Sequence, residues 1–520
     1  MTRIERTLRI GIDVGGTNTD AVLMDGTAVL AEVKTSTTDD VTSGIVAALR
    51  GLASAREFAP GQIQAVMIGT THFTNAIVEA SRLTETAVIR LALPATRALP
   101  PMVDWPDRLR LAIGDHGYLC HGGHEFDGRV IAPIDPEEIK KVAADLHAKG
   151  VRSVAISSVF SPVSAEFEQL AADVLRAELP EVHISLSHEI GRIGLLEREN
   201  ATIINACLRD LADGIVDAFG TALQTVGIDA PLFLSQNDGT LMDVEYTRRY
   251  PVATFASGPT NSMRGAAFLS GLADCAVVDI GGTTTDVGVL ARGFPRESAT
   301  EVDLGGVRSN FRMPDVLSVG IGGGSRVRGT AVGPDSVGYE LTRRALVFGG
   351  DTLTATDLAV AGGLAEIGDP GLVAHLDRSA VRATLARIAR DVAEIVDRMR
   401  TSAAPLPVVV VGGGSILLPD ELPGFPDVRR PDHFAVANAI GAAIAQVGGE
   451  VDRIFAIGVL TREEVLEHAK AEALDKAVAA GARPESAQIV EVDEVPIAYL
   501  PGNAVRIRVK AVGELEVARA

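Results

Sequence analysis

The chain has 520 residues and 47% of them are hydrophobic, so it is long enough for two or three domains with sizeable cores. A formal net charge of -20, without any long Lys/Arg cluster, argues against nucleic acid as a partner. The three cysteines are far apart, which argues against a disulfide framework, and charges or glycines interrupt every apolar run, which predicts a cytoplasmic enzyme without a membrane segment.

The chain begins with short apolar strands that alternate with helical patterns, which is typical of α/β architecture. Strands are expected at 8–13, 28–33 and 65–69, and helices at about 40–55 and 75–80. The first strand ends in Asp13-Val14-Gly15-Gly16-Thr17-Asn18-Thr19-Asp20. Glycine lets the backbone turn sharply and approach a ligand, while free amides and hydroxyls donate to oxyanions. We therefore predict that the phosphates of a nucleotide contact Gly15, Gly16, Thr17 and Asn18.

A second octapeptide repeats this pattern after another apolar run, as Asp279-Ile280-Gly281-Gly282-Thr283-Thr284-Thr285-Asp286. A single Gly-Gly turn between strands is commonly no more than a hairpin. Two copies with aligned aspartates favour function, and they predict two related lobes that hold one ATP between them, with Gly281, Gly282, Thr283 and Thr284 as the second set of phosphate contacts. No Walker-type P-loop occurs in the chain.

The aspartates of the two octapeptides are the candidate catalytic residues. A carboxylate at the end of a strand would repel phosphate, so Asp13 and Asp279 are predicted to bind Mg²⁺, directly or through water. Asp20 and Asp286 begin the following strands and could hold the hairpin or orient water. The expected cofactors are therefore ATP and Mg²⁺.

The next segment contains a cluster of possible metal ligands at 115–127, with three histidines, one cysteine and three acids. A zinc or iron site is one interpretation. The spacing matches no standard metal signature and glycines mark turns within the cluster, so the sequence favours a structural or solvated loop.

Candidate substrate contacts follow strand ends or lie near the lobe boundary. Thr71, His72 and Asn75 come directly after a strand, where open α/β sheets bind ligands, although they could equally cap a helix. Asn205 lies in a helix near the boundary, where it could form a wall of the cleft or serve only as part of a cap.

Three segments are predicted as domains: 1–195, 196–453 with an irregular insertion at about 293–360, and a small α+β appendage at 454–520. The helix predicted to begin after Asp135 should end at Gly150. The remaining expected elements are a strand at 151–156, helices at 164–179, 201–219, 380–402, 433–445 and 462–480, and strands at 232–234, 276–279, 489–492 and 504–509.

Two more glycine-rich turns follow buried-type strands. Gly412, Gly413, Gly414 and Ser415 come after four valines and suit a contact on the adenosine side of a nucleotide. Gly322, Gly323 and Gly324 have the same form. Either turn could be an ordinary connection from a strand to a helix.

The order of these motifs resembles the superfamily of acetate kinase, sugar kinases, heat-shock-70 proteins and actin. The closer resemblance is to the hydantoinase A and oxoprolinase family, and it rests on residues 11–20, 69–76, 197–206, 257–259, 279–286 and 321–325, with 333–336 and 354–357 continuing the order. This resemblance implies two actin-like, ribonuclease H-like lobes around an ATP cleft, with the helix at 433–445 returning to the first lobe. It also implies a separate hydantoinase B-like partner chain.

The sequence thus predicts an ATP-dependent hydrolase, or a subunit of one, that opens hydantoins, oxoproline or lactams after phosphorylating a carbonyl oxygen. An ATP-dependent carboxylase subunit acting on a ketone and a small-molecule kinase are the alternatives, and an ATP-driven chaperone is a more distant one. The substrate and the oligomeric state, including a possible homo-oligomer, remain open at this level.

Overall fold

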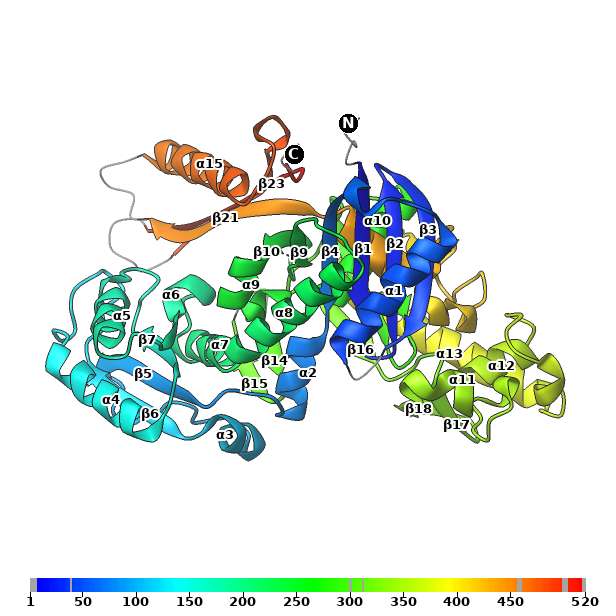
Figure 1. The fold of residues 1–520 in the computed structure, drawn as a ribbon, viewed down its shortest axis with the longest axis horizontal. Helices are drawn as coiled ribbons and strands as arrows, with labels where there is room; N and C mark the ends of the chain where they lie inside the picture. The colour runs from blue at the N-terminus through cyan, green and yellow to red at the C-terminus, as the bar shows by residue number, and fades with distance from the viewer. Residues whose placement is uncertain are drawn as a thin grey trace.

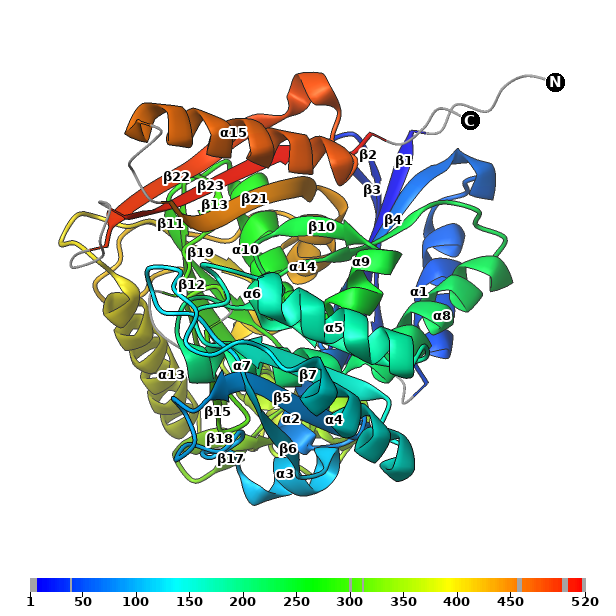
Figure 2. The ribbon, with the colours of Figure 1, turned by 90° about the vertical axis from the view of Figure 1, so that its left-hand side faces the viewer.

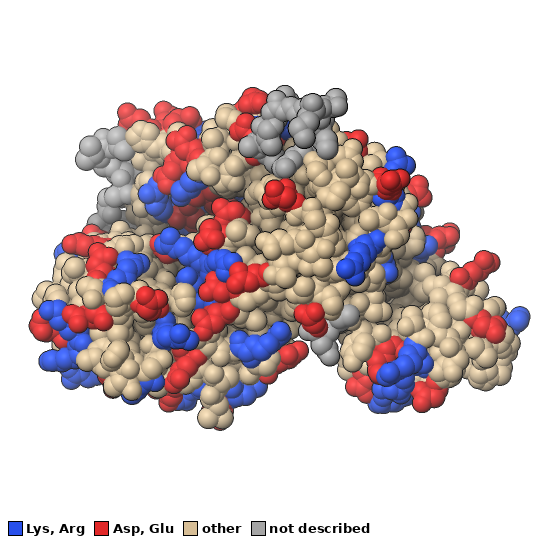
Figure 3. Space-filling view, in the orientation of Figure 1, with Lys and Arg blue, Asp and Glu red and all other residues tan. Residues whose placement is uncertain are grey.

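The computed structural model of the chain describes residues 7–37, 40–298, 302–310, 313–455, 461–497 and 504–516. It is a mixed α/β fold, as the alternating pattern predicted, and strands from distant parts of the chain meet in common sheets (Figure 1). Over these residues, no helix has both the length and the apolar character needed to cross a membrane. On the face shown in Figure 3, acidic and basic side chains are largely interspersed.

The largest sheet has nine strands and joins both ends of the chain. Strands β1 to β3 form an antiparallel meander, and β4 pairs with β1 in parallel. From edge to edge, the sheet consists of β22 (Gln488–Pro496), β23 (Val505–Gly513), β21 (Gln446–Phe455), β10 (Thr240–Asp243), β9 (Leu232–Ser235), β4 (Ile63–Thr70), β1 (Leu8–Val14), β2 (Asn18–Asp25) and β3 (Ala28–Ser36).

Helices cover both faces of β1, β2 and β4, which explains why these strands are apolar almost throughout instead of alternating. On one face lie α1 (Val41–Ala55) and α8 (Arg209–Thr225), and α14 (Ala437–Ala443) packs on the other. The start of α1 is fixed by Asp40, whose carboxylate accepts hydrogen bonds from the amides of Thr42 and Ser43.

A four-stranded parallel sheet, in the order β6-β5-β7-β8, forms a separate layer in the N-terminal half. Both predicted ends of α4 are confirmed, because Asp135 accepts from the amide of Glu137 and Gly150 adopts a φ of 73°. The elements of this region are β5 (Thr86–Leu93), β6 (His116–His121), β7 (Ser153–Ser158), β8 (His183–Leu186), α2 (His72–Glu79), α3 (Asp107–Ile113), α4 (Pro136–Lys149), α5 (Glu166–Glu178), α6 (Ser187–Ile190) and α7 (Leu195–Cys207).

The second octapeptide belongs to another sheet, in which β12 pairs with β11 and β16, and β11 pairs with β19. The long helix α13 packs against this sheet through one apolar stripe. Its elements are β11 (Cys275–Ile280), β12 (Thr285–Ala291), β13 (Phe294–Pro295), β16 (Val316–Val319), β19 (Val408–Val411), β20 (Val428–Arg429), α12 (Ala355–Ala361) and α13 (Arg378–Met399).

Two helices, α10 (Ser257–Ser270) and α14, lie in close contact between these two sheets. A Cβ atom at Gly441 would lie 1.9 Å from the carbonyl oxygen of Asn261, and one at Gly265 would lie 1.9 Å from that of Ala437. A Cβ atom at Gly11 of β1 would lie 2.1 Å from Ala439 O. Glycine therefore sets the distance between the helices, and α14, which lies within the helix expected at 433–445, packs on strand β1.

Short elements make up much of the segment between β13 and α12, where the sequence had weak periodicity. Two of its small sheets have only two strands each. The elements are β14 (Val302–Leu304), β15 (Val307–Ser309), β17 (Ser325–Arg328), β18 (Ala331–Ser336) and α11 (Leu341–Arg344). Two helices outside this segment, α9 (Val244–Arg249) and α15 (Arg462–Ala479), complete the α-helices of the described residues.

The sheets do not follow the lobe assignments expected from the sequence. The strand at 232–234 was placed with the second lobe, but β9 pairs with β4 in the N-terminal sheet. The C-terminal strands, expected in a separate appendage, extend that same sheet through β21. The single helix expected at 201–219 is two helices, α7 and α8, which meet at Leu208. Local patterns locate strands and helices but do not specify which distant segments they join. The domain divisions themselves stay a prediction.

Candidate active site

The two octapeptides fold into matching hairpins that meet at their tips. Asp13 lies opposite Asp20 across β1 and β2, and Asp279 lies opposite Asp286 across β11 and β12. Each turn closes with one backbone hydrogen bond, Gly15 N to Asn18 O at 3.0 Å and Gly281 N to Thr284 O at 2.9 Å. The hydroxyl oxygens of Thr17 and Thr283 are 3.4 Å apart. The structure therefore brings both predicted phosphate turns to one place.

Asp13 is a buried carboxylate with one oxygen that lacks a hydrogen-bond partner among the described residues. Its side chain is nearly inaccessible, and Oδ1 is the atom without a partner. Its Oδ2 accepts from the amide nitrogen of Asn438 at 3.0 Å, and the same nitrogen donates to Asp20 Oδ2 at 2.9 Å. Burial, followed by the charges of Asp20 and Asp279, raises the pKa of Asp13 to about 7.

The carboxylates of the second hairpin are half-buried. Asp279 Oδ2 accepts from the hydroxyl of Ser262 at 2.5 Å, and burial raises the pKa of Asp279. Asp286 accepts from the Ser318 hydroxyl, and burial raises the pKa of Asp286 to about 6. The two hairpins thus concentrate acidic groups whose charged forms are disfavoured, which is an arrangement that a bound cation would relieve.

Lys34 brings positive charge to this acidic group. It lies opposite Asp20 on the neighbouring strand β3, and its ammonium nitrogen is 2.5 Å from Asp20 Oδ1. The side chain also reaches the second lobe, because a Cβ atom at Gly413 would lie 3.6 Å from Lys34 Cε. No sequence pattern singled out this residue. Pairing of β3 with β2 would have revealed it, since cross-strand neighbours share a face.

The two further glycine turns both pack on the second hairpin. At Gly412, with a φ of 85°, a Cβ atom would lie 2.2 Å from Asp279 Oδ1, and at Gly414 it would lie 2.6 Å from Gly281 O. The amides of Gly323 and Gly324 donate to Gly281 O and Gly282 O, and that of Gly322 donates to the Ser325 hydroxyl. The amides of residues 322–324 therefore already donate to acceptors within the protein, and this turn packs against the second hairpin.

Helices α10 and α14 supply polar contacts to the aspartates that sequence reasoning did not select. Asn261 and Ser262 are consecutive on α10, and Asn438 lies on α14. A Cβ atom at Gly69 would lie 2.4 Å from both Asp13 Oδ1 and Asn261 Nδ2, so these two side chains converge beside β4. The Ser-Gly-Pro segment at 257–259, which is part of the family resemblance, lies one helical turn before Asn261. It is the sequence feature that could have pointed to these residues.

Thr71 and His72, both predicted substrate contacts, lie beside the first hairpin. The amide of Thr71 donates to Val14 O at 3.3 Å, next to the phosphate turn. His72 Nδ1 is 2.6 Å from the Thr70 hydroxyl, and burial, with a smaller contribution from Arg82, lowers the pKa of His72 to about 4. Asn75 follows in the first turn of α2, where its amide donates to Thr71 O.

Asn205 has a different environment from the other predicted substrate contacts. Its side chain is fully buried, and its amide nitrogen donates to the Ser185 hydroxyl at 2.9 Å and to Arg249 O at 3.0 Å. Its carbonyl oxygen accepts from the amide of Val252 at 3.5 Å. These hydrogen bonds join α7 to β8 and to the segment after α9, so we correct the assignment of Asn205 from substrate contact to packing.

The residues of the 115–127 cluster each contact different partners. His116 Nε2 is 2.6 Å from Glu85, His121 Nδ1 is 2.9 Å from Glu138, and buried His124 packs on Phe167. Burial raises the pKa of the Cys120 thiol to about 12. Within the described residues, no group of three or more His, Cys, Asp and Glu side chains is arranged to hold a metal ion.

Comparison with known proteins gives two family matches. The model for the hydantoinase/oxoprolinase N-terminal region matches residues 9–179, and the hydantoinase/oxoprolinase model matches residues 198–367. Together they cover more than half of the chain and include both hairpins.

Curated relatives are distant and longer than this chain. The caprolactamase subunit alpha of Pseudomonas jessenii is 29% identical over 423 residues, which cover 75% of this chain and 60% of the relative. The acetophenone carboxylase gamma subunit of Aromatoleum aromaticum is 27% identical over 395 residues, covering 68% and 52%. The 5-oxoprolinase 1 of Arabidopsis thaliana is 26% identical over 392 residues, covering 65% and 30%. The chain thus spans less than two thirds of the length of these relatives.

Solved structures match nearly the whole chain. The ATP-dependent caprolactamase from Pseudomonas jessenii superposes with a TM-score of 0.78 at 18% identity, covering 98% of this chain and 88% of that one. A nucleotide-free acetone carboxylase structure gives a TM-score of 0.70 at 17% identity, with the same coverage. At such identities the likeness shows the fold, and it confirms the predicted α/β class.

Proposed function

Because the chain belongs to the hydantoinase/oxoprolinase family, we propose that it is the ATP-using part of an enzyme that opens cyclic amides by phosphorylating their carbonyl oxygen. The observation that carries the proposal is the meeting of the two hairpins at Thr17 and Thr283, with buried Asp13 at the base of one hairpin and half-buried Asp279 at the base of the other. Relatives named caprolactamase and 5-oxoprolinase support the choice of substrate class.

The residues present fit Mg²⁺ and a nucleotide. Asp13 Oδ1 is buried without a hydrogen-bond partner among the described residues, and a divalent cation would satisfy it. Asp13 and Asp279 would hold the metal, directly or through water. Residues 15–18 and 281–284 would donate amides and hydroxyls to phosphate oxygens, and 412–415 would contact the adenosine side. When bound, Mg²⁺ would neutralise phosphate charge and orient the triphosphate.

The proposed chemistry needs ATP, two water molecules and a cyclic amide. The γ-phosphoryl group passes to the carbonyl oxygen and ADP leaves. Water then adds to the carbonyl carbon, and the C–N bond breaks with a proton going to nitrogen, which leaves an acyl phosphate. A second water molecule releases inorganic phosphate. Phosphoryl transfer of this kind depends mainly on positioning and charge stabilisation, which rigid hairpins supply.

His72 has properties that suit the substrate side of the cleft. Its lowered pKa keeps the imidazole neutral at physiological pH, so it can donate one hydrogen bond without carrying a positive charge. Its position two residues after β4, beside the first hairpin, supports a role next to the predicted phosphates. We propose that His72, with Thr71 and Asn75, orients the amide carbonyl toward the γ-phosphate.

The proposal includes a partner chain. The relatives named above include subunits designated alpha and gamma, and this chain spans only part of their length. A hydantoinase B-like chain would supply the ring-opening half of the reaction. Phosphoryl activation of a ketone for carboxylation is the second candidate, and the likeness to the acetophenone carboxylase gamma subunit favours it over a kinase.

The decisive experiment measures ADP release by the purified chain, with and without a candidate partner, on hydantoin, 5-oxoproline and caprolactam, and on acetophenone with bicarbonate. We expect ATP turnover that depends on a cyclic amide and product formation that depends on the partner. Mass spectrometry of the products separates the alternatives. A stable phosphoester made by the chain alone would instead establish a kinase, and ketone-dependent turnover would establish the carboxylase.

Replacing Lys34 tests whether its ammonium group contributes to nucleotide binding. In Lys34→Gln we expect nucleotide affinity to fall about tenfold or more, because a hydrogen bond to a charged group contributes roughly 1.5–3 kcal/mol. Calorimetric titration with a non-hydrolysable ATP analogue and Mg²⁺ measures the change. The matched control is Lys149→Gln, which removes an exposed ammonium paired with Asp145 on α4. Equal affinities for the two variants would remove Lys34 from the site.

A further inference from the structure

A cavity of about 460 Å³ lies between the C-terminal strands and the segment 291–298. This segment follows β12, whose first residues form the second hairpin, so the cavity is at the opposite end of that strand from the candidate active site. Seven residues of β-strand span roughly 20 Å. The cavity is therefore a separate feature, and its volume is in the range of small-molecule sites.

One wall of the cavity is a face of the C-terminal sheet with alternating rows of charge. Strand β23 lies between β21 and β22 and contributes Arg506, Arg508 and Lys510. In register with Lys510 and Arg508, β21 carries Glu450 and Asp452, and β22 carries Glu491 and Asp493. The intervening residues of β23 point to the other face, where α15 covers them (Figure 2). Basic side chains on β23 thus lie between acidic side chains on the two neighbouring strands.

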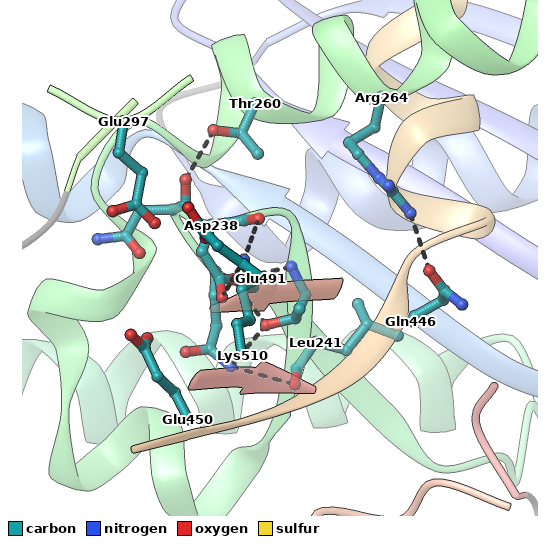
Figure 4. A network of polar contacts seen from close by, with 12 residues as sticks. Asp238, Leu241, Thr260, Arg264, Glu297, Gln446, Glu450, Glu491 and Lys510 are labelled. Carbon is teal, nitrogen blue, oxygen red and sulfur yellow. Dashed lines mark hydrogen bonds and ion pairs between the residues drawn. The ribbon is translucent and has the colours of Figure 1, made fainter. Parts of the chain in front are cut away.

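Most of these charges are satisfied within the protein. Lys510 Nζ lies 2.8 Å from Asp238 Oδ2 (Figure 4), and Arg508 Nε donates to Glu450 at 2.8 Å. Arg508 also pairs with Glu297 of the second lobe. The Arg508–Glu297 pair fastens the sheet to the segment after β13, while the other two contacts lie within the sheet and its β9–β10 connection, and we assign all three a structural role.

Two side chains on the cavity, of opposite charge, lack a close ionic partner among the described residues. Arg192 has its nearest carboxylate oxygen, on Glu297, at 3.7 Å, and its buried Nε atom has no hydrogen-bond partner there. Burial and the neighbouring Arg506 lower the pKa of Arg192, although it remains a cation at neutral pH. Asp493 is 54% exposed, and the nearest guanidinium nitrogen, on Arg508, is 3.7 Å away. Both residues line the cavity.

We propose that this cavity binds a small zwitterion with one carboxylate and one ammonium group, such as an amino acid. The guanidinium of Arg192 would pair with the carboxylate, a geometry that arginine favours, and Asp493 would accept from the ammonium group. Phe294 and Val495 line the same cavity and suit the methylene chain between the two charges. The inference uses no feature of the candidate active site, although the ω-amino acids that lactam hydrolysis would release belong to this class.

Calorimetric titration of the full chain without nucleotide tests the proposal. The probe is 6-aminohexanoate, and hexanoate and hexylamine are analogues that each lack one charged group. We expect saturable binding of the zwitterion and at least about tenfold weaker binding of both analogues. Arg192→Gln and Asp493→Asn should each weaken zwitterion binding about tenfold. The control Arg429→Gln, which removes an exposed arginine paired with Asp427, should leave it unchanged.

Several outcomes would overturn the proposal. They are the absence of saturable binding, equal binding of hexanoate or hexylamine, which would indicate an adventitious ion only, and unchanged binding in Arg192→Gln and Asp493→Asn. Since Asp493 is half-exposed on an edge strand, its variant is informative even if Arg192→Gln does not fold. Asp13→Asn should bind the zwitterion normally. Loss of binding in that variant would place the ligand in the candidate active site, and this separates the inference from the proposed function.

Discussion

Asp13→Asn is expected to reduce ATP turnover at least about a hundredfold while making the nucleotide-free protein more stable at pH 8. The loss follows because an amide cannot neutralise a divalent cation, and one lost charge contact of this kind costs about 3 kcal/mol in the transition state. The gain follows because ionised Asp13 is buried beside Asp20 and Asp279 with one oxygen that has no hydrogen-bond partner among the described residues. Function and stability should therefore change in opposite directions.

The sign of the pH dependence follows from the raised pKa of Asp13. The folded pKa is about 7 and the ordinary value is 3.8, so between these values the folded state binds more protons than the unfolded state. The destabilisation of the wild-type chain is absent below pH 4, grows as the pH rises, and is complete above pH 7. It amounts to roughly 4 kcal/mol, given about 1.4 kcal/mol for each pKa unit. The stability advantage of Asp13→Asn over the wild-type chain should grow over the same pH range.

Thermal unfolding of wild type and Asp13→Asn from pH 4.5 to 8.5, without nucleotide or metal, measures this effect, and a coupled ADP assay measures turnover. The matched control is Asp25→Asn at the exposed far end of the neighbouring strand β2, which should change neither quantity. Addition of Mg²⁺ and ATP should stabilise wild type more than Asp13→Asn. Undiminished turnover in Asp13→Asn combined with Asp279→Asn would refute the metal-binding roles.

Gly441→Ala is expected to destabilise the protein by about 3 kcal/mol and to weaken nucleotide binding. The new Cβ atom would lie 1.9 Å from the backbone oxygen of Asn261, and neither helix has a flexible side chain there that could give way. Helices α10 and α14 must then separate. That movement withdraws Asn438 from Asp13 and Asp20, because all three are held together by one amide group.

Gly214→Ala is the matched control for this steric effect. Gly214 is an exposed glycine inside helix α8, and a Cβ atom there would have no neighbour within 4 Å. We expect a gain of about 0.5–1 kcal/mol, since alanine costs less backbone entropy than glycine in a helix. Urea denaturation compares the midpoints of both variants with wild type. If Gly441→Ala unfolded at the wild-type midpoint, the close crossing of α10 and α14 would not be required for the stability of the protein.

Much of the local structure and the position of the hairpins could be predicted because their signals lie within short segments. The caps at Asp135 and Gly150 define α4 through residues next to the helix itself. The duplicated octapeptides carry their own turns and strand ends, so their similarity alone predicted related hairpins. Lys34, Asn261, Ser262 and Asn438 carry no comparable local pattern, and each acquires its place only through contact with another segment.

The sequence by itself therefore determined the α/β class, the two Asp-Gly-Gly-Thr turns and the order of most elements, because backbone preferences and hydrophobic periodicity act over a few residues. Only the tertiary structure decided that β9 and the C-terminal strands complete the N-terminal sheet, and that Asn205 serves packing. It also decided that Asn438 bridges Asp13 and Asp20, residues more than 400 positions away. Such pairings depend on which buried surfaces fit together and which buried polar groups find partners, and those requirements are met only once the whole chain has folded.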